Sequence, residues 1–249
     1  MNMRVAIISD IHGNLEALSS VLIDIRDKNV DRIICLGDVI GYGPNPNECI
    51  NVVETHCEYC LLGNHESAVF DKEIAMEFNK HARFSIEWTR NCLNLKSIDF
   101  IKKLEIVKIE EDFTSVHATP YRPGFWSYIS SMEEALFSFN FFKTKFCLIG
   151  HTHIPGVIVS ERRDSNITIL PPRSFDYETG FNKDARFIVN VGSVGQSRDK
   201  NPKSCYVIID TDLKKVCFFR VPYDIALYQK KMRIAGMPEF LITRIVDGY

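Results

Sequence analysis

Five short apolar runs in this 249-residue chain are each followed by side chains that can bind a metal ion. The runs end at Ile8, Leu36, Leu62, Val116 and Ile149, and the polar residues that follow them are Asp10, His12, Asp38, Asn64, His65, His117, His151 and His153. Continuous apolar runs of this length favour strands that are buried on both faces. In open α/β sheets ligands collect outside the carboxyl ends of strands, so we expect these side chains to lie on one rim.

The segment Ile33–Pro44 shows the pattern most sharply. A buried strand is followed by Gly37 and the single carboxylate of Asp38, and then by Gly41, Gly43 and Pro44, which favour a tight loop. A carboxylate at the mouth of a buried strand is costly unless a cation meets it. We therefore expect a cation beside Asp38.

Two carboxylates, one amide and at least four imidazoles are more ligands than one ion needs. They suit two divalent ions that share one carboxylate. A set of oxygen and nitrogen ligands without cysteine fits Mn, Fe, Co or Zn better than Ca or Mg, and we favour Mn. Asp10 and His12 are two residues apart, as are His151 and His153, so each pair points the same way if its backbone is extended.

The composition indicates an ordinary soluble globular protein, with 45% apolar and 25% charged residues. The net charge of −2 gives no signal for nucleic acid, and no apolar stretch predicts a membrane span. Eight cysteines and an N-terminus without a signal peptide predict reduced thiols and a cytoplasmic location. Cys57 and Cys60 have the spacing of half a zinc site or a redox pair, but no second pair stands near them, so we favour ordinary thiols.

The order of elements predicts one α/β (α+β) domain over residues 1–249, with two packed sheets and helices outside. The expected strands are Val5–Ile8, Ile33–Leu36, Tyr59–Leu62, Ile106–Ile109, Phe113–Val116, Phe146–Ile149, Val157–Ser160, Asn166–Leu170, Phe187–Val191, Tyr206–Ile209 and Val216–Val221. The expected helices cover 14–29, 46–53, 74–104 throughout, Met132–Phe139, 223–235 and 238–247.

Taken in order, Asp10-x-His12, Gly37-Asp38, Gly63-Asn64-His65-Glu66, His117 and Gly150-His151-x-His153 resemble the motifs of the calcineurin-like metallophosphoesterases. The later stretches Asn190–Gln196 and Pro222–Asp224 look like the bacterial phosphodiesterase branch of that family. The resemblance covers essentially the whole chain. It implies a four-layer sandwich of two mixed β-sheets flanked by helices.

The resemblance also implies roles for individual residues. Asp10, His12, Asp38 and His153 would hold one metal, and Asp38, Asn64, His117 and His151 the other, with Asp38 bridging. His65 would be the catalytic residue that faces the substrate phosphate without binding metal. In this mechanism a hydroxide that bridges the ions attacks phosphorus in line. His65 either stabilises the equatorial charge or protonates the leaving oxygen.

Two departures from other branches bear on the substrate. Serine/threonine phosphatases and symmetric dinucleoside tetraphosphatases carry an Arg four residues after the bridging Asp, where this chain has Tyr42. The former also place an Asp three residues after it, where this chain has Gly41. His65 therefore lacks an orienting carboxylate, which argues against a protein phosphatase and weakens the assignment as a tetraphosphatase.

We therefore expect a cytoplasmic, metal-dependent phosphodiesterase that hydrolyses phosphodiesters or nucleotide-like phosphates. The alternatives are a dinucleoside tetraphosphatase or phosphomonoesterase and, ranked lower, a non-catalytic protein-binding scaffold of the same fold. The expected partner is a small phosphorylated substrate. Four residues lie in loops that could reach the rim, where they would either contact substrate or pack within the loops: Tyr42, Tyr121, Arg122 and Trp126. The sequence assigns no substrate-binding residue. The natural substrate, the native metals and the oligomeric state stay open.

Overall fold

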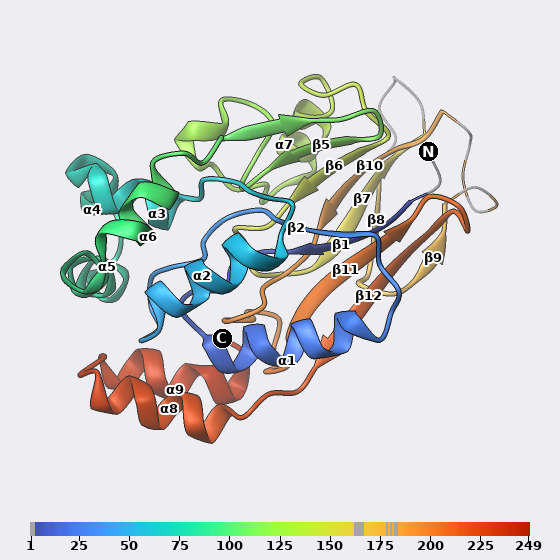
Figure 1. Ribbon diagram of the computed structural model, residues 1–249. Helices are drawn as coiled ribbons and strands as arrows, with labels where there is room; N and C mark the ends of the chain where they lie inside the picture. The colour runs from blue at the N-terminus through green and yellow to red at the C-terminus, as the bar shows by residue number, and fades with distance from the viewer. Residues whose placement is uncertain (1–2, 162–166, 178, 180, 182–183) are drawn as a thin grey trace.

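Two six-stranded sheets pack face to face in the computed structural model, with helices on their outer faces (Figure 1). The structure describes residues 3–161, 167–177, 179, 181 and 184–249. The strand orders are β3-β2-β1-β11-β12-β9 and β4-β5-β6-β10-β7-β8, and both sheets contain parallel and antiparallel pairs. The predicted α/β architecture of two mixed sheets flanked by helices is confirmed.

The first sheet is built from β1 (Arg4–Ile8), β2 (Arg32–Cys35), β3 (Tyr59–Cys60), β9 (Phe175–Asp176), β11 (Ser204–Asp210) and β12 (Lys215–Val221). The second is built from β4 (Val107–Ile109), β5 (Phe113–Val116), β6 (Phe146–Ile149), β7 (Gly156–Ser160), β8 (Ile167–Leu170) and β10 (Arg186–Asn190). In the first sheet β1, β2 and β3 are mutually parallel, and in the second β5, β6 and β10 are. The carboxyl ends of these parallel strands carry the polar residues that the sequence singles out.

The alternation of side chains along β1 explains why both sheets are buried. Val5 and Ile7 face the core between the two sheets, whereas Ala6 and Ile8 face the core under the helices. Both faces of the strand are therefore apolar, which is why its sequence is a continuous apolar run. In a short apolar run such as β1, polar side chains that can bind a ligand therefore follow the end of the strand.

The outer face of the first sheet is covered by α1 (Leu15–Arg26) and α2 (Pro46–His56), which lie in front of it in Figure 1. Two C-terminal helices, α8 (Ile225–Ile234) and α9 (Glu239–Asp247), pack together beside α1. On the other side, α7 (Met132–Ser138) leads into Phe139 and Phe142, which cover the outer face of the second sheet. A 3₁₀ turn, η1 (Pro123–Phe125), lies in the loop between β5 and α7.

The expectation of continuous helix over 74–104 is wrong. The segment contains α4 (Lys72–Glu77), α5 (Lys80–Cys92) and α6 (Leu95–Ile101), and it follows α3 (Asn64–Phe70), which the sequence did not indicate. Asp71, Asn79 and Asn94 each accept hydrogen bonds from backbone N–H groups one turn ahead, so each starts a new helix. Asn79 and Asn94 thereby interrupt an apolar pattern that is otherwise compatible with one long helix.

Other differences are smaller. Strand β3 ends at Cys60 rather than Leu62, α2 extends past Val53 to His56, and β9 was not expected. Of the strand expected over Asn166–Leu170, Asn166 lies outside the described residues. The assignment of residues 1–249 to one domain stays a prediction. Within the part of the chain that the structure describes, no helix is both long and apolar enough to cross a membrane.

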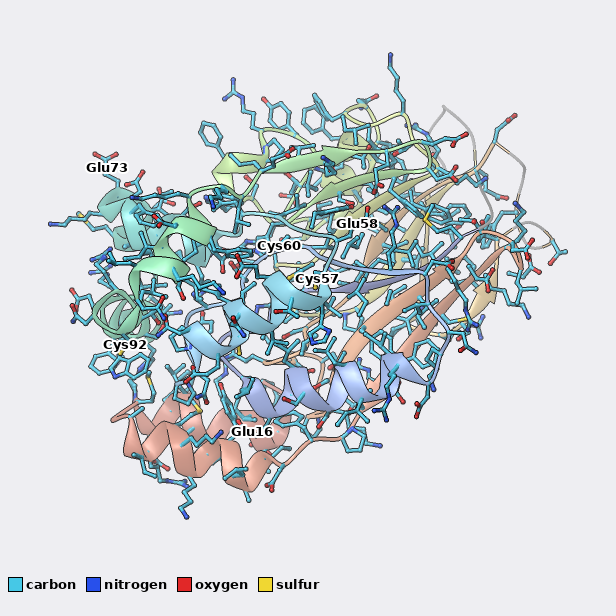
Figure 2. All side chains as sticks on the ribbon, viewed as in Figure 1. Glu16, Cys57, Glu58, Cys60, Glu73 and Cys92 are labelled. Carbon is cyan, nitrogen blue, oxygen red and sulfur yellow. The ribbon has the colours of Figure 1, made fainter. Side chains whose placement is uncertain are left out.

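Figure 2 shows Cys57 and Cys60 near the carboxyl end of α2. Burial raises the pKa of the Cys57 thiol, and a hydrogen bond with Cys35, together with burial, raises that of Cys60. Both groups are therefore neutral thiols, and neither belongs to a candidate metal cluster of the described residues.

We predict that Cys57→Ser and Cys60→Ser keep the metal content of the wild type, and that Cys60→Ser lowers the stability of the fold by about 1–3 kcal/mol. Elemental analysis and thermal unfolding would check this; loss of bound metal from a folded double variant would contradict it.

Candidate metal centre

The carboxyl ends of β1, β2 and β3 of one sheet meet those of β5 and β6 of the other, and the candidate ligands lie at this junction. Asp10, His12, Asp38 and His153 form one cluster, and Asp38, His117 and His151 form a second, with the donor atoms in each cluster within 4.8 Å of one another. Asn64 joins the second cluster through its Oδ1 atom, 3.2 Å from Nε2 of His117. The expected rim therefore exists, but the two sheets supply it jointly, and Asp38 is common to both clusters.

Backbone carbonyls fix the orientation of three imidazoles. Nδ1 of His12 lies 3.1 Å from the Ile40 oxygen, and Nδ1 of His117 lies 3.0 Å from the Leu36 oxygen. Nδ1 of His153 is 2.5 Å from the oxygen of Gln196. A carbonyl oxygen only accepts hydrogen bonds, so Nδ1 carries the proton in each ring and Nε2 of the neutral ring presents a lone pair. Metal-binding histidines in proteins are held in this way.

The acceptor atoms of the first cluster point toward one another. Nε2 of His12 lies 3.0 Å from Nε2 of His153, and Oδ1 of Asp10 is 3.1 Å from the same His153 nitrogen. Three acceptor atoms at these distances repel one another unless a cation lies among them. The first cluster therefore fits a divalent ion on the chemistry of its donors alone.

The second cluster shows the same preference. Nε2 of His117 is 3.2 Å from Nδ1 of His151 and 3.3 Å from Oδ2 of Asp38. Burial favours the neutral ring of His117, but the negative charge of Asp38 outweighs it and raises the pKa of this ring to about 10. A positive charge is thus strongly favoured at this position, and a divalent ion in place of the proton satisfies the same acceptors.

The two carboxylates are anchored by the backbone. Oδ2 of Asp10 accepts the N–H of His151 at 3.0 Å, and Oδ1 of Asp38 accepts the N–H of His65 at 2.9 Å. Burial alone would raise both pKa values, but the surrounding imidazoles hold the pKa of each carboxyl below its ordinary range. In each carboxylate one oxygen is fixed by a peptide group while the other faces the histidines.

The backbone is not extended at the two ligand pairs, Asp10 with His12 and His151 with His153. The condition under which the two members of a pair would point the same way is therefore not met. Asp10, His12, His151 and His153 have φ values of 54°, 53°, 63° and 61°, in the left-handed region. Asp10 and His12 still belong to one cluster, whereas His151 and His153 belong to different clusters. Hydrogen bonds from the N–H groups of Asp10 and His12 to the oxygens of Gly37 and Asp38 hold the turn after β1 in place.

Glu66 is a positioning residue to which the sequence assigned no role. Its buried carboxylate accepts four backbone N–H groups, those of Asp38, Val39, Ile40 and Gly63, at 2.7–3.1 Å. It therefore fastens the loop that carries Asp38 to the first turn of α3. The spacing of Gly63 and Glu66 is that of a helix capping box, which is the signal that could have identified it.

His65 belongs to neither cluster and is buried beside them. Its ring packs against His12, Tyr42 and Phe78 at centroid distances of 4.6–4.9 Å. Nε2 lies 4.0 Å from Oδ2 of Asp38, and Nδ1 has no hydrogen-bond partner among the described residues. Burial holds the pKa of His65 well below its ordinary value, so the ring is neutral. Packing, rather than a carboxylate, orients it.

A cavity of about 360 Å³ opens above the clusters. Ile74 and Phe78 from the segment around α4 line it, as do Phe125, Trp126 and Tyr128 from the loop after β5. Tyr42 and Trp126, two of the four loop residues considered from the sequence, line the cavity. Tyr121 and Arg122 do not: Tyr121 packs on Phe137 and Phe141, and Arg122 lies over the rings of Tyr121 and Phe125. The sequence did not indicate Phe78, Phe125, Tyr128 or Arg198, which also line it.

Comparisons with known proteins gave matches to a protein family, to a relative in sequence and to solved structures. A family model for the calcineurin-like phosphoesterases matches residues 3–155. An uncharacterized protein of Methanocaldococcus jannaschii is 34% identical over 250 residues, which cover 98% of each chain. The crystal structure of a metallophosphoesterase from Sphaerobacter thermophilus is similar with a TM-score of 0.87 and 38% identity, over 100% of both chains. A hypothetical protein from Pyrococcus horikoshii OT3 shares the fold, with a TM-score of 0.77 and 17% identity over 99% of this chain and 98% of that one.

We predict that the chain binds two divalent ions and that Asp38→Ala lowers metal content and turnover more than His12→Ala does. Asp38 belongs to both clusters and His12 to one, so loss of Asp38 removes negative charge from between two cations. Elemental analysis and turnover after purification without chelator and reloading with Mn²⁺ would check this. His81→Ala, a change outside both clusters, is the control. Full activity at a stoichiometry that never exceeds one ion would contradict the prediction.

We also predict that Glu66→Gln lowers the thermal unfolding midpoint and weakens metal binding. The amide nitrogen would face backbone N–H donors, and each buried donor left unsatisfied costs about 1–3 kcal/mol. Calorimetry and metal titration would measure both effects, with Glu48→Gln on the exposed side of α2 as the matched control. Equal unfolding midpoints in the two variants would remove Glu66 from its positioning role.

Proposed function

The chain belongs to the calcineurin-like phosphoesterase family, a family of hydrolases that act on phosphoric esters, and from this premise we propose that it is a two-metal phosphodiesterase acting on small phosphodiesters or nucleotide-like phosphates. The observation that carries the proposal is the pair of acceptor clusters that share Asp38 at the base of a cavity. A neutral histidine, His65, lies beside the shared carboxylate.

In this proposal Asp10, His12, Asp38 and His153 hold one ion, and Asp38, Asn64, His117 and His151 hold the other. Mn²⁺ is our first choice, and Fe, Zn or Co fits the same oxygen and nitrogen donors. Bound there, two divalent ions supply Lewis acidity toward a phosphoryl group and lower the pKa of water. The chain itself holds the donors in fixed orientations through the carbonyls of Ile40, Leu36 and Gln196.

His65 acts on the substrate phosphate rather than on the metals. Gly41 lies against Nδ1 so closely that an added Cβ would be 2.0 Å from it, which leaves Nε2 as the nitrogen on the side of Asp38. Because the ring is neutral, its N–H is suited to hydrogen-bond a phosphoryl oxygen as charge develops there. Of the two roles considered from the sequence, we therefore favour stabilisation of equatorial charge over protonation of the leaving group.

The walls of the cavity support a substrate with a planar or apolar ester group. Phe125 is 70% exposed although it lines the cavity, and Tyr128 stacks on the ring of His151 at 4.2 Å. Ile74 and Phe78 line the same cavity from α4 and the residue after it. Aromatic and aliphatic side chains at the mouth of a phosphate site suit a nucleoside or aryl ester.

The direct test is a panel of phosphate esters after metal reconstitution. The protein, stripped of metal and reloaded with Mn²⁺, is assayed on nucleoside phosphodiesters, aryl diesters, phosphomonoesters and dinucleoside tetraphosphates. We expect diester cleavage that a chelator abolishes. Activity on monoesters or tetraphosphates alone would replace the proposed substrate class, and inactivity with every metal would contradict the proposed function.

We predict that His65→Ala retains both metals but lowers turnover by about 10²–10³-fold. The loss should be similar for esters of good and poor leaving groups, because the ring stabilises charge on oxygens that do not depart. Turnover across diesters of graded leaving-group pKa, with metal content measured in parallel, would check this, and His81→Ala is the matched control. A loss that shrinks for nitrophenyl esters would identify His65 as the general acid, and wild-type turnover would remove it from the mechanism.

A further inference from the structure

One guanidinium in the cavity has no carboxylate partner. Arg198 is the one Lys or Arg among the described residues that line the cavity. Its Nη2 donates to Oε1 of Gln196 at 3.0 Å and lies 3.5 Å from the hydroxyl of Tyr42. Nε is buried without a hydrogen-bond partner, and no ion pair in the described part of the chain includes Arg198. The adjacent carboxylate, Asp199, is paired with Arg220 instead.

The segment that carries Arg198 is fixed to the metal centre. The N–H of Arg198 donates to the oxygen of His153 at 3.3 Å, and the Gln196 oxygen lies 2.5 Å from Nδ1 of the same histidine. Ser193 Oγ donates to the oxygen of Asp10 at 2.8 Å and accepts the N–H of Gln196 at 2.8 Å. The backbone of Arg198 is therefore held in register with two candidate ligands of the first cluster.

The charge of Arg198 acts on this site. Burial is the main cause of the low pKa values of His65 and His153, and the positive charge of Arg198 lowers both further. Arg198 makes no ion pair and lies beside the candidate site for two divalent ions, so its charge is incompletely balanced in this partly buried position, which is unfavourable. An anion bound in the cavity removes this penalty, and a phosphate accepts the planar donor fork of arginine well.

We propose that Arg198 binds the phosphoryl group of the substrate through its non-bridging oxygens, on the side of the cavity nearest His153 and Tyr42. This inference rests on the proposed function for the identity of the substrate. Arg198 thereby supplies a protein cation for the phosphate in addition to the metal ions. It is a substrate-binding residue and not a metal ligand.

The test compares Arg198→Gln and Arg198→Lys with Arg122→Gln, which removes the same charge from an exposed arginine that does not line the cavity. Two quantities are measured on metal-loaded protein: KM for a diester, and the dissociation constant of inorganic phosphate by calorimetry. We expect Arg198→Gln to raise both by about 10–100-fold with metal content unchanged, Arg198→Lys to recover part of the loss, and Arg122→Gln to change neither by more than about twofold.

Several outcomes would overturn the proposal. Unchanged phosphate affinity in folded, metal-loaded Arg198→Gln would do so, as would equal losses in Arg122→Gln. Loss of metal from Arg198→Gln would show that Arg198 acts through His153. The Tyr42→Phe variant keeps the ring and removes the hydroxyl. If it lost as much phosphate affinity as Arg198→Gln, Arg198 would act through Tyr42. Because phosphate binding is measured without turnover, a protein that cleaves no ester but binds phosphate through Arg198 would contradict the proposed function and support the phosphate site.

Discussion

The lone pairs of His12 and His153 face each other at 3.0 Å, and much of the structure around them serves to keep them there. Two peptide carbonyls fix which nitrogen of each ring carries the proton, so neither ring can turn its N–H toward the other without losing a buried hydrogen bond. Such an arrangement is stable with a cation and strained without one. The acceptors around His117 repeat this logic and share Asp38 with the first cluster. The donor chemistry of both clusters therefore favours bound cations.

The ligands come from both sheets, and this has a structural consequence. Asp10 and Asp38 follow β1 and β2 of the first sheet, whereas His117 and His151 follow β5 and β6 of the second. The core between the sheets, which includes Ile7, Leu36 and Leu148, sets the separation of these strand ends. Glu66 then fixes the Asp38 loop to α3 through four hydrogen bonds. The geometry of the site thus depends on packing far below it as well as on its own hydrogen bonds.

The sequence was most informative where one physical rule dominates. Strands that are buried on both faces are mostly apolar, so the polar residues that follow them were visible in the sequence. The residues brought together by the structure include all seven of the expected ligands. It was less informative where two rules compete. The caps Asn79 and Asn94 divide a stretch whose apolar spacing favours one helix. The left-handed φ values at Asp10 and His12 depend on tertiary hydrogen bonds. Arg198 lies more than 150 residues from Tyr42 in sequence, so only the fold reveals their contact.

Gly41 and Tyr42 both act on the position of the His65 ring. Gly41 has a φ of 85°, and a Cβ there would meet Nδ1 of His65 at 2.0 Å, so this position has no room for an orienting carboxylate while the ring stays where it is. The ring of the next residue, Tyr42, packs against both His12 and His65, and this contact orients the ring of His65. The hydroxyl of Tyr42 in turn meets Arg198, which enters from the loop after β10. The loop after β2 therefore orients the ring of His65 by packing, while Asp38 of the same loop binds its backbone N–H. Other branches of the family carry an arginine at the position of Tyr42. In our proposal this chain instead supplies a cation to the phosphate through Arg198, from the loop between β10 and β11.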